Sequence, residues 1–309
     1  MFQHCVRVIT TCGRLLLNFA DFEGSLGASL LPLATERHLI TRPGDGSDKL
    51  PWQTYDYLKL GGPETRDRLC TVLDTIYERN ADVSVSILAA VKQRFTELNQ
   101  QAQKLTFDVA FAYVKRQLST VALQSDEAVT PHDDVVAVVA AEMPRFSVSP
   151  SERTTHVGEY LMTLPQHLES FSSLDGGGGA DDDDADIDRA LEVALLAGRL
   201  PFAPDGDLDN MADQWLSSII QATEHSYVEA VTHISRLTPN GCRQIVADLD
   251  YMANVVDSLG MCVSGQLNEL RELLDAANED EMREKAGKLT SANNSHLVDV
   301  VCKMRGMSI

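Results

Sequence analysis

The hydrophobic residues of this chain recur every three or four positions over most of its length. This spacing places apolar side chains along one face of a helix. Strictly alternating runs rich in Val, Ile and Thr, which would indicate strands, are nearly absent. The pattern therefore predicts an all-α protein, built as an elongated array of antiparallel helical bundles.

The most regular part of the pattern predicts a long helix over residues 81–122. A heptad-like seam of this length must be buried against another helix. The apolar positions of the seam are Leu88, Val91, Phe95, Leu98, Ala102, Leu105, Val109 and Ala112.

Shorter helices are predicted on the N-terminal side of this long helix. One covers residues 2–23, and the other begins at Pro63, a residue that suits the first turn of a helix, and ends near Asn80. The glycines and prolines between them predict a loop from Gly24 to Pro63. Residues 1–125 are thus predicted to form one helical bundle.

The remainder of the chain is predicted to form a second bundle over residues 151–309. Residues 126–150 contain Pro131, Pro144 and Pro150 and are predicted to connect the two bundles. The apolar spacing predicts helices over residues 151–171, 186–197, 208–236, 240–259, 265–276 and 279–305. Pro165 lies inside the first of them and is expected to kink or end it near Leu164.

A run of four glycines and four aspartates interrupts the second bundle at residues 176–184. Such a run cannot pack a core, and its like charges repel one another. We predict a disordered loop over residues 172–186 that joins helices of a single bundle.

Helix start and stop residues stand at several of the predicted boundaries. Thr238 and Pro239 suit the N-cap and first turn of the 240–259 helix, and Gly260 suits its C-terminal cap. Asn278 can cap the acidic first turn of the helix predicted over residues 279–305. Asp207 or Asp209 can cap the helix predicted from residue 208.

The charge is distributed unevenly along the chain, whose formal net charge is −20. Residues 121–309 hold 33 of the 46 acidic residues and 12 of the 26 basic ones. An acidic surface of this kind repels nucleic acid and anionic lipid head groups, so nucleic-acid binding is not expected. The acidity either serves solubility or indicates a basic partner protein.

The six cysteines are scattered and form no CxxC pair, and no histidine stands at a metal-ligand spacing from them. This usage fits a reducing compartment. No signal peptide is visible, and no apolar run approaches the length of a membrane span. We expect a cytosolic protein whose membrane association is peripheral.

Motifs that carry chemistry are missing from the sequence, so we predict no catalytic, cofactor-binding or metal-binding residue and no small-molecule substrate. There is no Walker A loop, GxGxxG, GxSxG or HExxH motif. His225 and His233 are eight residues apart and are interpreted as ordinary surface or partly buried histidines. Residues 205–209 resemble the start of a calcium loop, but the glycine and glutamate that the motif requires are replaced by Asn210 and Leu216.

Trp215 stands on a helical stripe with Met211, Ile219 and Ala222. The stripe favours a role as a large apolar anchor between helices. The alternative is an interface hot spot, because tryptophan is enriched in such positions.

Three blocks of the sequence carry a family resemblance: Tyr160–Glu169, Ala190–Phe202 leading to Leu208–Trp215, and Asp248–Gly260. They resemble subunit seven of the conserved oligomeric Golgi complex. Weaker similarity at Phe2–Phe22 and in the heptad segment extends the likeness over most of the chain. Members of that family are longer, and this chain looks like their C-terminal part, which would leave out the N-terminal helical region that helps such subunits assemble.

The resemblance implies a rod-like helical subunit of a multisubunit tethering complex, with no enzymatic activity. It implies a peripheral location on the cytosolic face of the Golgi membrane, with the other subunits of the complex and other Golgi trafficking proteins as partners. Its implied role is to support intra-Golgi retrograde transport, Golgi organisation and retention of glycosylation enzymes.

Two other functions stay open at this stage. The chain could be a helical scaffold of another tethering complex, such as an exocyst-type subunit. It could also be a helical metal-dependent hydrolase that uses His132 and Asp133, although no further His and Asp residues stand in register with them.

Overall fold

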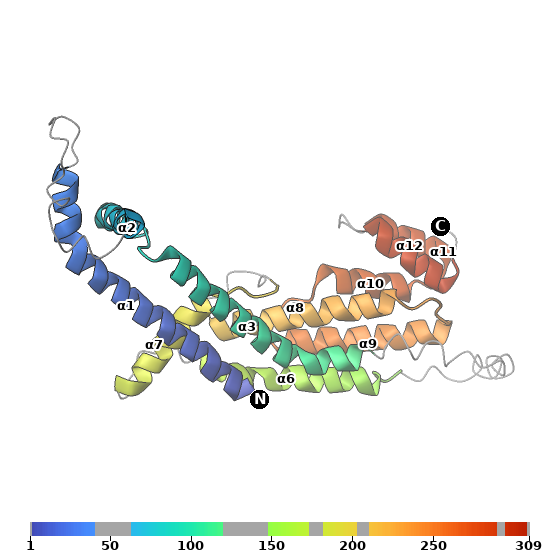
Figure 1. Cartoon of the computed structure of the whole chain (residues 1–309). Helices are drawn as coiled ribbons and strands as arrows, with labels where there is room; N and C mark the ends of the chain where they lie inside the picture. The colour runs from blue at the N-terminus through green and yellow to red at the C-terminus, as the bar shows by residue number, and fades with distance from the viewer. Residues whose placement is uncertain are drawn as a thin grey trace. The chain divides into compact units, whose positions relative to one another are not determined.

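The computed structural model describes residues 2–40, 63–119, 148–172, 182–202, 210–288 and 294–307. Every regular element within these ranges is an α-helix, so the fold is all-α as predicted (Figure 1). Contacts between residues divide the chain into two compact units. Unit 1 comprises residues 1–3, 104–178 and 200–309, and unit 2 comprises residues 4–103 and 179–199. The division predicted from the sequence, at residues 126–150, stays a prediction.

Unit 2 is built from α1 (Phe2–Ile40), α2 (Pro63–Ala81), the first half of α3 (Ala89–Leu118) and α7 (Asp182–Leu196). Pro63 opens α2 and Asn80 stands one residue before its end, which confirms both predicted boundaries. A core cluster joins α1, α2 and the turn before α3 through the buried side chains Ala34, Leu73, Ile76 and Ile87. Farther along, the rings of Phe19 on α1 and Phe95 on α3 meet edge to face at 5.7 Å.

The loop predicted from Gly24 to Pro63 is wrong over residues 24–40, where α1 continues as a helix with Pro32 inside it. The reason is tertiary packing. Ala34 is fully buried, and Leu30 and Leu31 pack against the same core cluster as Ile76. Burial of these side chains outweighs the weak helix propensity of the glycines and proline. Residues 41–62 lie outside the described ranges, as does the predicted connection up to residue 147.

The predicted seam of α3 is also wrong as a buried surface. Val91, Leu98 and Leu105 are 43%, 41% and 59% exposed. The buried face of α3 instead carries Asn99, Gln103, Thr106, Phe107, Ala110, Val114 and Leu118. The helix itself is present, although residues 82–88 precede it as turns rather than as its first two turns. Hydrophobic periodicity identifies an apolar face, but the other helices decide which face is covered.

The Gly/Asp tract is partly described. The loop predicted over residues 172–186 is wrong for residues 182–186, which form the start of α7. Ala190, Leu191 and Ala194 of α7 are at most 3% exposed, and burial of this face stabilises the helix. Residues 173–181 lie outside the described ranges.

Unit 1 contains a bundle of α6 (Glu152–Ser172), α8 (Met211–Thr232), α9 (Pro239–Ser258) and α10 (Gly265–Asp275), in which α6 and α10 each contact both α8 and α9 (Figure 1). Its core holds large side chains that are at most 1% exposed: Leu161, Leu164, Leu168, Phe171, Trp215, Ile219, Ile220, Tyr227, Leu249, Met252, Leu267, Leu270 and Leu273.

Pro165 does not end α6, which continues to Ser172. The predicted helix end is wrong because Pro165 is exposed whereas Leu164, Leu168 and Phe171 are buried on the opposite face. Packing of that face holds the helix across the hydrogen bond that the proline removes.

The helix predicted over residues 279–305 is in fact two helices, α11 (Glu279–Lys288) and α12 (Asn294–Arg305). The sequence between them includes Thr290, Ser291 and Asn293, residue types whose side chains compete for backbone hydrogen bonds. Arg305 at the end of α12 donates to the carbonyl oxygens of Leu273 at 3.0 Å and Ala276 at 2.6 Å. These bonds cap the C-terminus of α10 and attach α12 to it.

Most predicted helix caps are confirmed. The Thr238 hydroxyl accepts from the Gly241 amide at 3.1 Å, with Pro239 as the first residue of α9. Gly260 has a φ of 73° after α9, where a left-handed cap belongs. The Asn278 side chain accepts from the Glu281 amide at 2.9 Å.

The cap predicted for α8 is wrong, because the helix begins later than expected. Asn210 caps α8 by accepting from the Ala212 amide at 2.8 Å. Asp207 and Asp209, which were predicted for this role, lie outside the described ranges.

Candidate functional site

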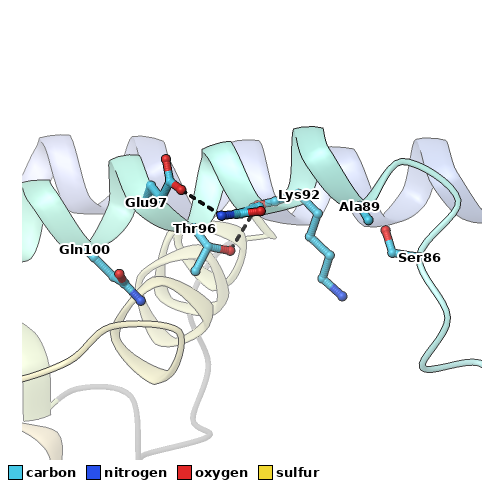
Figure 2. Close-up of a pocket in the computed structure, with 7 residues that line it drawn as sticks. Ser86, Ala89, Lys92, Thr96, Glu97 and Gln100 are labelled. Carbon is cyan, nitrogen blue, oxygen red and sulfur yellow. Dashed lines mark hydrogen bonds between the residues drawn. The ribbon is translucent and has the colours of Figure 1, made fainter.

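The surface of α3 carries an open pocket of about 500 Å³ (Figure 2). It is lined by Ser86, Ala89, Lys92, Gln93, Thr96, Glu97 and Gln100. Several of these side chains bond within the helix: Gln93 donates to Glu97 at 3.0 Å, and Thr96 donates to the Lys92 carbonyl at 3.0 Å. A lining of two amides, two hydroxyls, one cation and one carboxylate suits hydrogen bonding to another polar surface.

Two side chains on the buried face of α3 form hydrogen bonds to the last turn of α7 within unit 2. The side-chain amides of Asn99 and Gln103 donate to the Ala194 carbonyl at 2.8 Å and 2.6 Å. Both residues are at most 2% exposed. These bonds satisfy a carbonyl in the last turn of α7, where intrahelical partners run out. Gly198 follows, and a Cβ there would overlap the Gln103 side chain, so the chain passes close against α3.

Glu23 is a buried carboxylate at the junction of α1, α2 and the turn before α3. One oxygen accepts from the Ser86 hydroxyl at 2.7 Å and the Leu88 amide at 3.1 Å, and the other pairs with Arg79 at 2.8 Å. Burial by itself raises the pKa of Glu23, but hydrogen bonds from Ser86, Arg79 and Leu88 outweigh it and lower the pKa to about 2. The folded unit therefore holds this carboxylate in its charged form.

The low pKa of Glu23 predicts that unit 2 loses stability in acid. Above pH 4.5 the folded and unfolded states are both ionised at this group, so its contribution is complete. As the pH falls from 4.5 toward 2, the unfolded state takes up a proton before the folded state does, and up to about 3 kcal/mol is lost. Hydrogen exchange of α1 and α2 as a function of pH measures this loss.

Glu23→Gln is the variant that tests this assignment. It should be less stable than the parent at pH 7 and should lack the extra loss of protection between pH 4.5 and 2. Glu36→Gln, at an exposed position of the same helix, should keep both the stability and the acid profile of the parent. An unchanged acid profile in Glu23→Gln would contradict the assignment.

Unit 1 also contains buried carboxylates, and one of them, Asp248 on α9, is 6% exposed. It accepts from the Ser151 amide at 2.6 Å, the Ser151 hydroxyl at 2.8 Å and the Tyr227 hydroxyl at 3.2 Å. Burial, together with the charge of Asp248, raises the pKa of Tyr227 well above its usual value. The cluster joins the start of α6 to α8 and α9, and its bonds fix these helices in one register.

Among the described residues, those singled out from the sequence form no common site. Trp215 is 1% exposed and its ring lies 5.2 Å from that of Phe171, so the core role is confirmed. His225 and His233 are both exposed, as expected for surface histidines. His132 and Asp133 lie outside the described ranges. Among the described residues, no group of His, Cys, Asp and Glu is arranged to hold a metal ion.

Glu23, Asn99, Gln103 and Asp248 are examples of buried polar residues that the sequence did not reveal. Their only local signal is a polar residue on or beside an apolar stripe, which surface positions also show.

None of the helices that the structure describes is long and apolar enough to cross a bilayer.

The family model described as Golgi complex component 7 (COG7) matches residues 1–306. Conserved oligomeric Golgi complex subunit 7 of Homo sapiens is 36% identical over 298 residues, which cover 90% of this chain and 37% of the human protein. The Mus musculus protein of the same name is 34% identical over 326 residues, covering 99% of this chain and 40% of the mouse protein. The Arabidopsis thaliana protein is 24% identical over 324 residues, covering 99% and 35%.

This chain therefore spans about two fifths or less of the length of these relatives. No solved structure matches the chain significantly.

Proposed function

The chain belongs to the Golgi complex component 7 (COG7) family, and from this premise we propose that it acts as a non-enzymatic subunit of the conserved oligomeric Golgi complex. Its partners are the other subunits of that complex, which it meets through helix–helix contacts. It acts at the cytosolic face of Golgi membranes, as a peripheral protein. Its role is to support retrograde transport within the Golgi, Golgi organisation and the retention of glycosylation enzymes.

The observation that carries this proposal is the unbroken extent of the similarity. The family model matches residues 1–306, across both compact units rather than one motif. The packing supports the same role. Buried polar junctions at Glu23 and Asp248 fix how the helices of each unit meet, so each unit can present fixed helix faces to other proteins.

A chimera tests the proposal. The segment of the human relative that matches this chain is replaced by the whole chain, and the chimera is expressed in human cells that lack the relative. We expect it to co-precipitate the other subunits of the complex and to restore surface glycans, measured by lectin labelling. The intact human protein and the human protein without the segment are the positive and negative controls.

The proposal is wrong if the chimera accumulates as a folded protein yet recovers no other subunit. Recovery of the subunits without restored glycans would keep the assembly role and remove the role in enzyme retention.

A further inference from the structure

Two helices of unit 2 each leave a row of large apolar side chains exposed. On α1, Val8, Leu15 and Phe22 are 50%, 41% and 57% exposed. On α3, Val91 and Leu98 are 43% and 41% exposed. Members of each row are seven residues apart, close to two helical turns, so each row runs almost straight along its helix.

The two rows lie at the same level along an antiparallel helix pair. The ring of Phe19 on α1 contacts that of Phe95 on α3. Four residues farther along α1, Glu23 accepts from the amide of Leu88, which precedes Phe95 by seven residues. The two segments therefore run in opposite directions. From the Phe19–Phe95 contact, Phe22 lies three residues along α1 and Val91 lies four residues back along α3. At about 1.5 Å per residue these two are level to within about 2 Å.

Both rows also lie on the side of the α1–α3 pair that faces away from α7. On α1, a Cβ at Gly13 would touch Ala190 of α7, whereas Phe19 faces α3. At about 100° per residue, the order around α1 is the α7 contact, the α3 contact and then the exposed row. The order around α3 is the same: the α7 contact is made by Asn99, the α1 contact by Phe95, and the exposed row follows at Leu98. We name Val8, Leu15, Phe22, Val91 and Leu98 the outer face.

Basic residues border the outer face. Arg7 and Arg14 are exposed and directly precede Val8 and Leu15 in the chain, and Asp21 occupies the third equivalent position. On α3, the side chain of Arg94 is 68% exposed and pairs with Glu97 at 3.1 Å. Two arginines against one aspartate make the α1 side of this border basic, although the chain as a whole is strongly acidic.

We propose that the outer face docks an amphipathic helix of a partner protein, with apolar residues at heptad spacing and acidic residues beside them. Two level rows at heptad spacing match the way a helix packs its apolar side chains between those of two others. Acidic flanks complement Arg7 and Arg14. A second copy of this chain fits poorly, because a two-fold contact would bring the two Arg14 residues, at the middle of the row, close together.

The inference deepens the proposed function by naming a partner surface, and cross-linking at that surface tests it. A photo-reactive benzophenone amino acid replaces Leu15 in the full chain, carried within the chimera described above. After illumination in cells, the cross-linked peptide is identified by mass spectrometry. We expect a helical segment of another protein with an apolar heptad pattern and acidic neighbours.

Variants connect the cross-link to the face. Leu98→Glu on the opposite helix should reduce cross-linking from position 15 by about tenfold or more, because it places a charge in the apolar contact. Arg7→Glu with Arg14→Glu should reduce it similarly through charge repulsion. Leu196→Glu is the matched control, since Leu196 is 65% exposed in the same unit but lies on α7. It should leave the cross-link unchanged.

Other outcomes overturn the inference. A cross-link to another copy of this chain makes the outer face a homodimer contact. A cross-link to a basic or non-helical segment, or none at all, removes the proposed partner. A partner helix of the stated chemistry without recovery of Golgi complex subunits would keep the outer face and refute the proposed function. If the parent gives no cross-link and Leu98→Glu still recovers those subunits at parental levels, the proposed function stands and the outer face is refuted.

Discussion

Replacing Trp215 with alanine is expected to destabilise unit 1 by about 4 kcal/mol. The indole is 1% exposed and contacts the ring of Phe171, which in turn contacts the ring of Phe2 at 5.9 Å. Truncation removes the transfer free energy of a large aromatic side chain and leaves a cavity between α6 and α8 that the rigid bundle fills only in part. Hydrogen exchange of α6 and α8, together with denaturant unfolding followed by circular dichroism, measures the loss.

Met162→Ala is the matched control for this variant. Met162 lies on α6 in the same unit but is 49% exposed, so its truncation should change the stability by less than about 1 kcal/mol. Trp215→Phe should be intermediate, because it keeps a ring against Phe171. A Trp215→Ala protein as stable as Met162→Ala would mean that the indole is not the anchor of this core.

Local sequence signals predicted the capping residues of α9 and α11 correctly. Thr238, Pro239, Gly260 and Asn278 act within a few residues of themselves, and all four stand where the sequence placed them. Helix periodicity likewise gave the all-α class, because burial of a stripe requires the 3.6-residue repeat wherever the covering helix lies.

The predictions failed where contacts with distant segments of the chain determine the local structure. Residues 24–40 look like a loop by propensity, yet Ala34 packs with Leu73 and Ile76, which are about forty residues away in the sequence, and this packing keeps the segment helical. Glu23 likewise depends on Arg79 and Ser86. A single sequence shows that these residues are polar or small, but not which of them meet.

The α3 seam illustrates a different limit. Its heptad spacing correctly identifies an apolar helix face, but Leu98 stays exposed while Asn99 beside it is fully buried. The pattern records every contact for which a helix is suited, including contacts with molecules other than this chain. The failed prediction and the proposed outer face therefore rest on the same residues.

Gly13 is the position where the smallest change in side chain should have a very large effect. A Cβ at Gly13 would overlap the carbonyl oxygen of Ala190, lie 2.6 Å from its carbonyl carbon and lie 3.1 Å from the Ala194 Cβ. Backbone atoms in the middle of α7 cannot rotate away, so Gly13→Ala must push α1 from α7. We expect a loss of about 4 kcal/mol in unit 2, at the upper end for overpacking, because an intact helix backbone has to move. Faster hydrogen exchange in α1 and α7 would report it.

Gly24→Ala on the same helix is the matched control for Gly13→Ala. A Cβ there meets nothing within 4 Å, so alanine should stabilise α1 by up to about 1 kcal/mol through its better helix propensity. The two variants make the same chemical change in one helix and should move its stability in opposite directions. If Gly13→Ala were as stable as Gly24→Ala, α1 could not approach α7 this closely. The assignment of the outer face to the side away from α7 would then lose its support, since Gly13 defines where α7 lies.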